Sequence, residues 1–250
     1  MTLVAEFKAA RTKPSPNHDE RRHAIDILLL HYTGMKTAEA ALARLTDPAA
    51  RVSSHYLVHE DGGVDQLVAE ARRAWHAGVS SWQGATDINS RSIGIEIVNR
   101  GHDFDYPDFP DAQVDAVIAL SHDIVARHKI PKARVLAHSD VAPERKLDPG
   151  EKFPWARLAA AGVGLWVEPA PTRPGKMVGL DDRGEHVAEL QRVLARFGYA
   201  ADITHRYDQA TREVVSAFQR HFRPARVDGI ADASTMETLR RLLTASSAIA

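Results

Sequence analysis

The chain has 250 residues, with 32 Lys and Arg against 33 Asp and Glu, 13 histidines and no cysteine. This length accommodates a core of about 150 residues and a smaller second unit. The near-neutral charge excludes the basic surface that nucleic acids and anionic membranes require, so no nucleic-acid partner is expected. Without cysteine, disulfides and thiolate metal sites are excluded, and any metal must be bound by histidine and carboxylate.

No apolar run reaches the roughly 18 residues of a membrane-spanning helix, so no transmembrane segment is expected. Residues 24–30 follow Arg21, Arg22 and His23 and imitate a secretory signal. Asp26 interrupts this stretch and no small-residue cleavage site follows it. We therefore interpret it as a buried strand. Nothing in the sequence indicates an obligate protein partner.

Strand and helix patterns alternate from this stretch onward. Residues 26–32 predict a strand, and residues 37–45 predict a short helix. Two apolar runs, at residues 55–59 and 64–68, are joined by a Glu-Asp-Gly-Gly turn. This turn composition favours an antiparallel hairpin.

The next segments complete an α/β pattern. Residues 92–98 are rich in Ile and Val and predict a central strand. Apolar residues then recur at helical spacing from Asp111, the expected N-cap, as far as His128. Residues 135–138 predict a last short strand. This order predicts a mixed central β-sheet flanked by helices.

The composition changes at residues 167–176, where three prolines within six residues oppose both helix and sheet. We interpret this segment as a linker between a catalytic domain at residues 1–166 and a small helical domain at residues 177–250. The two units are expected to fold separately, with the chemistry in the first.

Three short helices are predicted beyond the linker. The first runs from about Glu185 to Phe197, where Gly198 is placed to end it. The second starts after Asp208 and the third after Asp232. A bundle of this size is too small for a deep active site, so we expect it to bind ligands rather than catalyse.

Three residues form a candidate metal site. His31 and His138 each close a predicted strand, where scaffolds present side chains to a shared cleft. Asp148 precedes Pro149 and Gly150, a rigid turn that can return its carboxylate to the same point. Two histidines and one carboxylate are typical of a catalytic zinc site. The alternative for Asp148 is a turn residue that hydrogen-bonds its own backbone.

Five segments carry a resemblance to a known family. They are Leu-Leu-His-Tyr-Thr at 29–33, Ser-Ser-His-Tyr-Leu-Val at 53–58, Ala-Trp-His-Ala-Gly at 74–78, Ser-Ile-Gly-Ile-Glu-Ile-Val-Asn at 92–99, and Ala-His-Ser-Asp through Arg-Lys-Leu-Asp-Pro-Gly at 137–150. Together they resemble the zinc N-acetylmuramoyl-L-alanine amidases, the amidase-2 family, which is related to the peptidoglycan recognition proteins. The resemblance implies Zn²⁺ bound by His31, His138 and Asp148.

The same resemblance implies roles for Glu96 and Lys146. Glu96 is expected to be the general base and acid, and Lys146 is expected to stabilise the oxyanion. A carboxylate within an Ile-rich strand is costly to bury, and burial raises its pKa as a general base requires. Lys146 precedes Asp148 by two positions, so both point to one side of an extended segment. The alternatives are pairing of Glu96 with a nearby arginine, such as Arg91, and a solvated Lys146.

Four further residues are candidates for substrate contact. Trp75 and His76 are expected to line the cleft, with a structural role as the alternative. His55 is expected near the metal as a supporting or substrate-binding residue and not as a ligand. Asn99 is expected to hydrogen-bond the stem peptide or, alternatively, to cap a turn.

The C-terminal bundle resembles the three-helix peptidoglycan-binding domain of wall hydrolases. The matching positions are Val187, Leu190, Gln191, Leu194, Gly198, Tyr199, Asp208, Thr211, Phe218, Gln219, Asp228, Gly229, Thr235 and Leu239. The spacer at residues 202–206 and the segment at residues 221–224 depart from the common pattern. A helical cap that only stabilises the catalytic domain is the alternative.

The resemblance implies hydrolysis of the amide between N-acetylmuramic acid and L-alanine in peptidoglycan or muropeptides, with reducing and 1,6-anhydro sugars both open. A wall-binding bundle favours the cell envelope or periplasm, and the lack of a visible signal peptide favours the cytoplasm. The alternative function is a non-catalytic peptidoglycan-binding or sensing protein.

Overall fold

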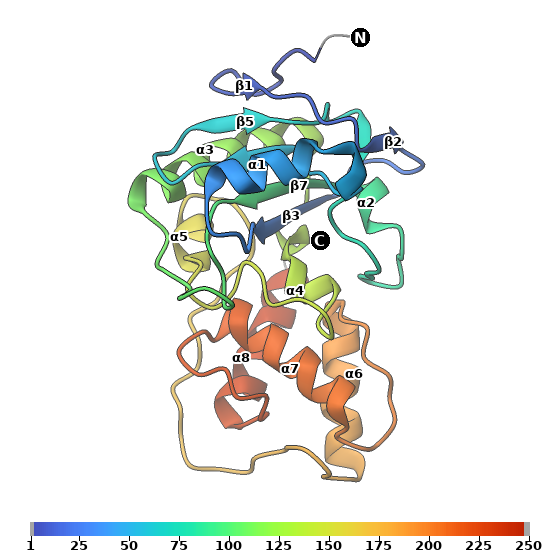
Figure 1. Ribbon diagram of the computed structural model, residues 1–250. Helices are drawn as coiled ribbons and strands as arrows, with labels where there is room; N and C mark the ends of the chain where they lie inside the picture. The colour runs from blue at the N-terminus through green and yellow to red at the C-terminus, as the bar shows by residue number, and fades with distance from the viewer. Residues whose placement is uncertain (1–2, 248–250) are drawn as a thin grey trace.

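A computed structural model describes residues 3–247 and contains a six-stranded sheet of order β1-β5-β4-β7-β3-β8 (Figure 1). The strands are β1 (Arg11–Thr12), β3 (Ile27–Tyr32), β4 (Tyr56–Val58), β5 (Val64–Gln66), β7 (Ser92–Ile97) and β8 (Val135–Ala137). Only the β4–β5 hairpin is antiparallel within this sheet. A two-stranded sheet pairs β2 (His18–Glu20) with β6 (Arg72–Ala74). The predicted mixed sheet, its hairpin and its central strand are confirmed.

Helices cover both faces of this sheet. They are α1 (Ala38–Thr46), α2 (Ile88–Arg91), α3 (Asp111–His128), α4 (His138–Val141) and α5 (Trp155–Ala160). Leu28 and Leu30 pack with α3, while Leu29 points to the opposite face, because strand side chains alternate. α1 and α3 lie on opposite sides of the sheet (Figure 1). The N-cap of α3 is Pro110, so Asp111 is its first helical residue and not its cap.

The three C-terminal helices begin where the sequence predicts, and the first also ends at the predicted Phe197. They are α6 (Glu185–Phe197), α7 (Gln209–Phe222) and α8 (Ala233–Ser247). The Asp208 carboxylate caps α7 by accepting from the Thr211 N–H, and Gly198 ends α6. Residues 167–176 have no regular secondary structure. Within residues 3–247, no helix is long and apolar enough to cross a bilayer.

The bundle packs directly against the unit that contains the sheet. One apolar cluster includes Leu29 and Trp82 from the first unit together with Leu194 and Phe197 from the bundle. The Trp82 ring lies edge-on to Phe197 at 5.9 Å between ring centroids. A Cβ on Gly198 would come within 2.5 Å of this ring, so the close approach requires glycine. The sequence predicts two units that fold separately. The structure adds an apolar interface through which the cores of the two units are in contact.

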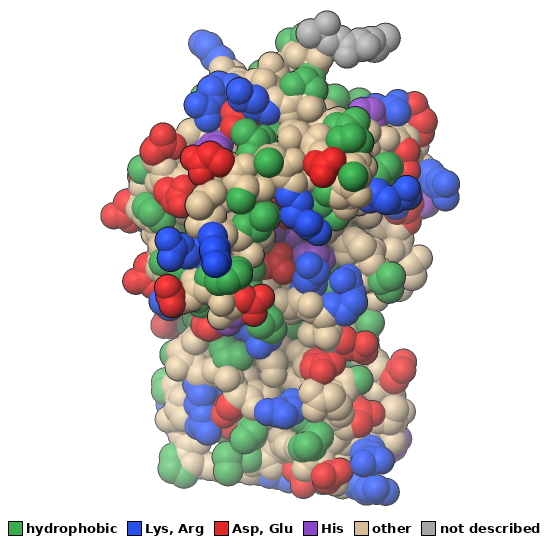
Figure 2. Space-filling view, in the orientation of Figure 1, with side chains coloured by type: hydrophobic (Ala, Val, Ile, Leu, Met, Phe, Trp, Pro, Cys, Tyr) green, Lys and Arg blue, Asp and Glu red, His purple; other side chains and the backbone are tan. Residues whose placement is uncertain are grey.

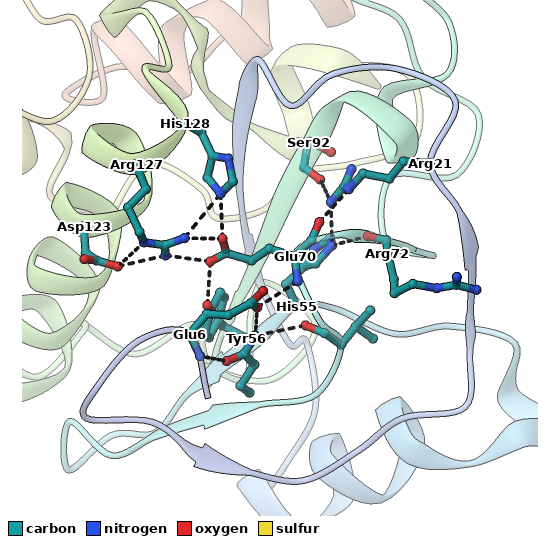
Figure 3. Close-up of polar contacts among 12 residues, drawn as sticks. Glu6, Arg21, His55, Tyr56, Glu70, Arg72, Ser92, Asp123, Arg127 and His128 are labelled. Atoms are coloured by element: carbon teal, nitrogen blue, oxygen red, sulfur yellow. Dashed lines mark hydrogen bonds and ion pairs between the residues drawn. The ribbon is translucent and has the colours of Figure 1, made fainter. Parts of the chain in front are cut away.

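A buried polar cluster ties the N-terminal segment to the sheet and to the end of α3 (Figure 3). Glu70 accepts hydrogen bonds from the Tyr56 hydroxyl at 2.6 Å, from Arg127 Nη2 at 2.7 Å and from His128 Nε2 at 2.6 Å. The Glu70 backbone N–H donates to Glu6 Oε2 at 2.9 Å. Burial opposes the charge of Glu70, but these side-chain donors outweigh it and lower its pKa to about 2.

Candidate active site

Adjacent strands bring the predicted metal ligands together. His31 lies at the end of β3 and is paired in register with Glu96 on the parallel strand β7, so both side chains share one face. His138 follows β8 as the first residue of α4. The Ser139 N–H donates to the Asp148 carbonyl at 3.0 Å, which returns the Asp148 loop to the same point.

The three ligand atoms form a nearly equilateral triangle. His31 Nδ1 lies 2.9 Å from His138 Nδ1 and 3.0 Å from Asp148 Oδ2, and the third side measures 3.1 Å. All three residues are buried. Tetrahedral zinc with bonds of about 2.0 Å places its ligand atoms roughly 3.3 Å apart. The donor set and its spacing therefore fit a single small cation.

The tautomer of His138 follows from its outer hydrogen bond. His138 Nε2 lies 3.1 Å from the Ala77 carbonyl oxygen. A carbonyl only accepts, so Nε2 carries the proton and Nδ1 presents its lone pair to the triangle. This is the usual support of a metal-bound histidine, whose outer N–H is held by a backbone carbonyl or carboxylate.

A chain of three hydrogen bonds fixes the tautomer of His31. The Ser92 hydroxyl donates to the Ile88 carbonyl at 2.6 Å, so its oxygen accepts from His76 Nε2 at 3.3 Å. His76 Nδ1 is then unprotonated and accepts from His31 Nε2 at 3.0 Å. His31 Nδ1 is left with a free lone pair. Gly94 permits this arrangement, because a Cβ there would meet the His76 ring at 2.6 Å.

The triangle consequently consists of three acceptors that face one another with no proton between them. Burial, and then the charge of His138, lowers the pKa of His31 to about 4, which keeps its imidazole neutral. Burial opposes the charge of Asp148, but His138 and His31 outweigh it and lower its pKa. Deprotonated ligands in a buried cluster are what metal binding requires. A bound cation would remove the mutual repulsion of these lone pairs.

The triangle opens into a cavity whose wall carries both predicted catalytic residues, Glu96 and Lys146. In Figure 2 a hollow lies near the middle of the face, with histidine atoms inside it and Lys or Arg side chains on its rim. Burial, and then the charge of Asp148, raises the pKa of Glu96. Glu96 Oε2 is buried without a hydrogen-bond partner among the described residues. Arg91 pairs with Asp26 at 3.0 Å, so the alternative pairing with Glu96 is wrong.

The four residues predicted to contact substrate are placed differently. Trp75 and His76 line the cavity, and His76 also supports His31. His55 is fully buried away from the cavity wall, with Nδ1 accepting from the Gly94 N–H at 2.9 Å. Asn99 accepts from the Gly101 N–H at 2.9 Å and donates to the Pro107 carbonyl at 2.9 Å, as the turn-capping alternative expected. Neither His55 nor Asn99 is among the residues that line this cavity.

The cavity also has lining residues that the sequence reasoning did not single out. They include Tyr32, Met35 and Arg44. Arg44 is exposed on α1, three residues after the buried Ala41. The helical pattern of residues 37–45 predicts which side of α1 faces the sheet, but it does not indicate that this helix borders a cavity.

The fold and this site define a class of protein with a His-His-Asp group, at the strand ends of a mixed sheet, that could hold a metal ion. The profile of the N-acetylmuramoyl-L-alanine amidase family matches residues 21–151, and a peptidoglycan-binding domain profile matches residues 183–239. AmiD of Escherichia coli K12, an N-acetylmuramoyl-L-alanine amidase, is 42% identical over 249 residues that cover 90% of this chain and 87% of the relative. The chain belongs to the N-acetylmuramoyl-L-alanine amidase family.

Further relatives agree in sequence and structure. AmpD of Enterobacter cloacae, a 1,6-anhydro-N-acetylmuramyl-L-alanine amidase, is 35% identical and covers 60% of this chain and 89% of the relative. E. coli AmiD in complex with anhydro-N-acetylmuramic acid-L-Ala-D-γ-Glu-L-Lys has a TM-score of 0.77 and 38% identity, covering 97% of this chain and 93% of the relative. Pseudomonas aeruginosa AmpDh3 with anhydromuramic pentapeptide also has a TM-score of 0.77, at 31% identity and with 98% and 99% of the two chains covered.

Proposed function

We propose that this chain is a zinc-dependent hydrolase that cleaves the amide bond between N-acetylmuramic acid and L-alanine, including the 1,6-anhydro form of the sugar. The observation that carries the proposal is the convergence of His31, His138 and Asp148 beneath a cavity that also holds Glu96 and Lys146. The intact ligand set argues against a purely binding or sensing role. The anhydro sugar is supported by the anhydromuramic ligands of the AmiD and AmpDh3 complexes.

Zinc held by the three ligands would lower the pKa of a water molecule and polarise the substrate carbonyl. Glu96 is the general base and acid: it takes a proton from the attacking water and passes it to the departing alanine nitrogen. Its raised pKa suits both transfers. Lys146 lines the same cavity and donates to the carbonyl oxygen as negative charge develops there. Trp75 contacts the sugar or the stem peptide at the cavity wall.

We further propose that the bundle binds peptidoglycan and that the enzyme acts in the cell envelope. The match of residues 183–239 to a peptidoglycan-binding profile supports this proposal. The proposed division is a catalytic domain at residues 1–166, a linker at residues 167–176 and a binding domain at residues 177–250. A bound wall polymer would raise the effective concentration of scissile bonds at the cavity.

Metal analysis and product analysis together test this function. Purified protein should contain about one zinc per chain, and a strong chelator should abolish turnover. Mass spectrometry of digests should reveal free stem peptides from both anhydro-muropeptides and intact sacculi. Active protein without a transition metal would overturn the metal assignment, and zinc-loaded protein without either product would overturn the enzymatic one. Fractionation of cells should find the protein in the envelope, and recovery with the cytoplasm would overturn that location.

A further inference from the structure

A buried carboxylate links the bundle to one of the metal ligands. Asp140 lies in α4, two residues after His138, and is fully buried at 0% exposure. Its Oδ2 accepts from the Ala137 backbone N–H at 2.8 Å and from His221 Nδ1 at 2.6 Å. Its Oδ1 accepts from the Tyr199 hydroxyl at 2.6 Å. Two of these three donors come from the bundle.

Both bundle donors are held firmly in place. The Tyr199 ring lies edge-on to Trp82, with 5.0 Å between ring centroids. The His221 ring is stacked between Trp155 and Phe222, at 3.7 Å from each. Tyr199 and His221 are themselves buried at 3% and 2% exposure. The two groups are therefore rigid, desolvated donors that reach across the interface between the units.

Tyr199 and His221 hold α4, which is too short to be stable without tertiary contacts. α4 (His138–Val141) has only four residues, about one turn, and at its end the Ala142 N–H donates to the His138 carbonyl at 3.0 Å. A single turn is unstable without tertiary contacts. The direction in which His138 leaves the backbone therefore depends on what fixes this turn. The Ala137 N–H bond to Asp140 closes the turn just before the ligand.

A shift of this turn would also displace Asp148, the second ligand, because the Ser139 N–H in the turn donates to the Asp148 carbonyl at 3.0 Å. Loss of the two bundle donors would leave the Asp140 charge buried with the Ala137 N–H as its remaining described donor. A buried charge without sufficient donors is strongly unfavourable, so the turn would rearrange to reach water.

We propose that the bundle is a structural part of the metal centre, in which Tyr199 and His221 act through Asp140 as positioning residues for His138. This inference rests on the proposed metal-dependent function. It assigns the bundle a task that is independent of peptidoglycan binding. It also explains why a wall-binding unit would present two buried polar side chains to its neighbour instead of an apolar surface alone.

The test measures metal affinity in the full-length protein. A Tyr199→Phe, His221→Phe variant keeps an aromatic ring at both positions and removes both donors. Its dissociation constant for Zn²⁺, measured by chelator competition, should rise by about tenfold or more, in the range seen for supports of metal ligands. The visible absorption spectrum of the Co²⁺-loaded variant should change as well, because it reports the arrangement of ligands and not overall stability.

Tyr207→Phe is the matched control. The Tyr207 hydroxyl is also buried and donates at 2.7 Å, but to the Gly229 carbonyl inside the bundle. This variant should be destabilised in thermal unfolding and yet keep Zn²⁺ affinity within about threefold of the wild type, because the lost hydrogen bond does not touch Asp140. His221→Asn places an amide donor near the position of Nδ1 and should restore affinity relative to His221→Phe.

The outcomes separate this inference from the proposed function. Zn²⁺ affinity that is equal in the double variant and in Tyr207→Phe would overturn the positioning role, while wild-type zinc binding would leave the enzyme assignment intact. A wild-type protein that binds no zinc would overturn both. If the double variant fails to fold, the comparison of Tyr199→Phe with Tyr207→Phe decides by the same criterion.

Discussion

His31 Nε2 and His76 Nδ1 lie 3.0 Å apart, and this contact determines which nitrogen of His31 faces the metal triangle. His76→Phe keeps a ring of similar size but removes the acceptor. We expect the dissociation constant for Zn²⁺ to rise by about 10- to 100-fold, because the His31 imidazole is no longer fixed in the ligating tautomer. Chelator competition with the purified variant measures this change.

Ser92→Ala provides a graded comparison for His76. It removes the hydroxyl that sets the His76 tautomer but leaves the His76 ring in place. Its effect on zinc affinity should therefore be in the same direction and smaller. A His76→Phe variant with wild-type zinc affinity and a raised KM would contradict this support of His31. It would favour the substrate contact that the sequence predicts for His76.

Glu96→Gln should separate metal binding from catalysis. Glutamine has the same shape but cannot accept the proton, so kcat should fall by on the order of 10² to 10⁴. Zinc content should equal that of the wild type, because Glu96 lies outside the ligand triangle. Single-turnover rates on an anhydro-muropeptide, together with metal analysis, provide the measurement. A zinc-loaded Glu96→Gln enzyme with near-normal kcat would show that Glu96 has only a structural role.

The sequence predicts the parts of this site that depend on strand patterns. His31 and Glu96 stand out because each lies in an apolar strand, and the parallel register of those strands then places them side by side. The sequence does not predict α4, because four residues have no helical periodicity. The partners of Asp140 lie 59 and 81 positions further along the chain and become neighbours only when the bundle docks. The sequence around Asp140 does not indicate which distant residues will donate hydrogen bonds to its carboxylate.

Glu70 makes stability depend on pH in the acidic range. Its pKa is lowered to about 2 in the folded protein, against about 4.3 for an unfolded chain. Its ionisation therefore stabilises the fold above about pH 4.3, and this contribution is lost as the pH falls towards 2. The magnitude is on the order of 3 kcal/mol. Urea unfolding should show a stability gap between wild type and Glu70→Gln at pH 5 that narrows at pH 3.

Tyr56→Phe is the control for Glu70→Gln. Tyr56→Phe removes one neutral donor and leaves the carboxylate ionised, so its deficit relative to wild type should change less with pH than that of Glu70→Gln. A Glu70→Gln deficit that is equally large at pH 5 and pH 3 would mean that the charge of Glu70 contributes nothing and that packing explains the loss.

Truncation after Pro169 tests whether the catalytic unit is independent of the bundle. The linker pattern alone predicts a truncated chain that hydrolyses soluble muropeptides at the full rate. The interface predicts otherwise, because removal of the bundle would expose Trp82 and Trp155 and take two donors from Asp140. Each re-exposed aromatic side chain costs about 1.5–3 kcal/mol. We expect the melting temperature to fall by about 10 °C and the soluble rate to fall with zinc affinity.

Gly198→Ala tests the same interface by a single substitution, without removal of the bundle. The added Cβ would lie within 2.5 Å of the Trp82 ring, and the backbone φ of +144° is strained for alanine. The variant therefore disturbs docking while the outer surface of the bundle remains intact. It should reduce hydrolysis of soluble muropeptides and of sacculi by a similar factor, whereas the truncation should reduce hydrolysis of sacculi further by removing the tether. A truncated chain with unchanged melting temperature, zinc affinity and soluble rate would show that the interface contributes nothing to the catalytic unit.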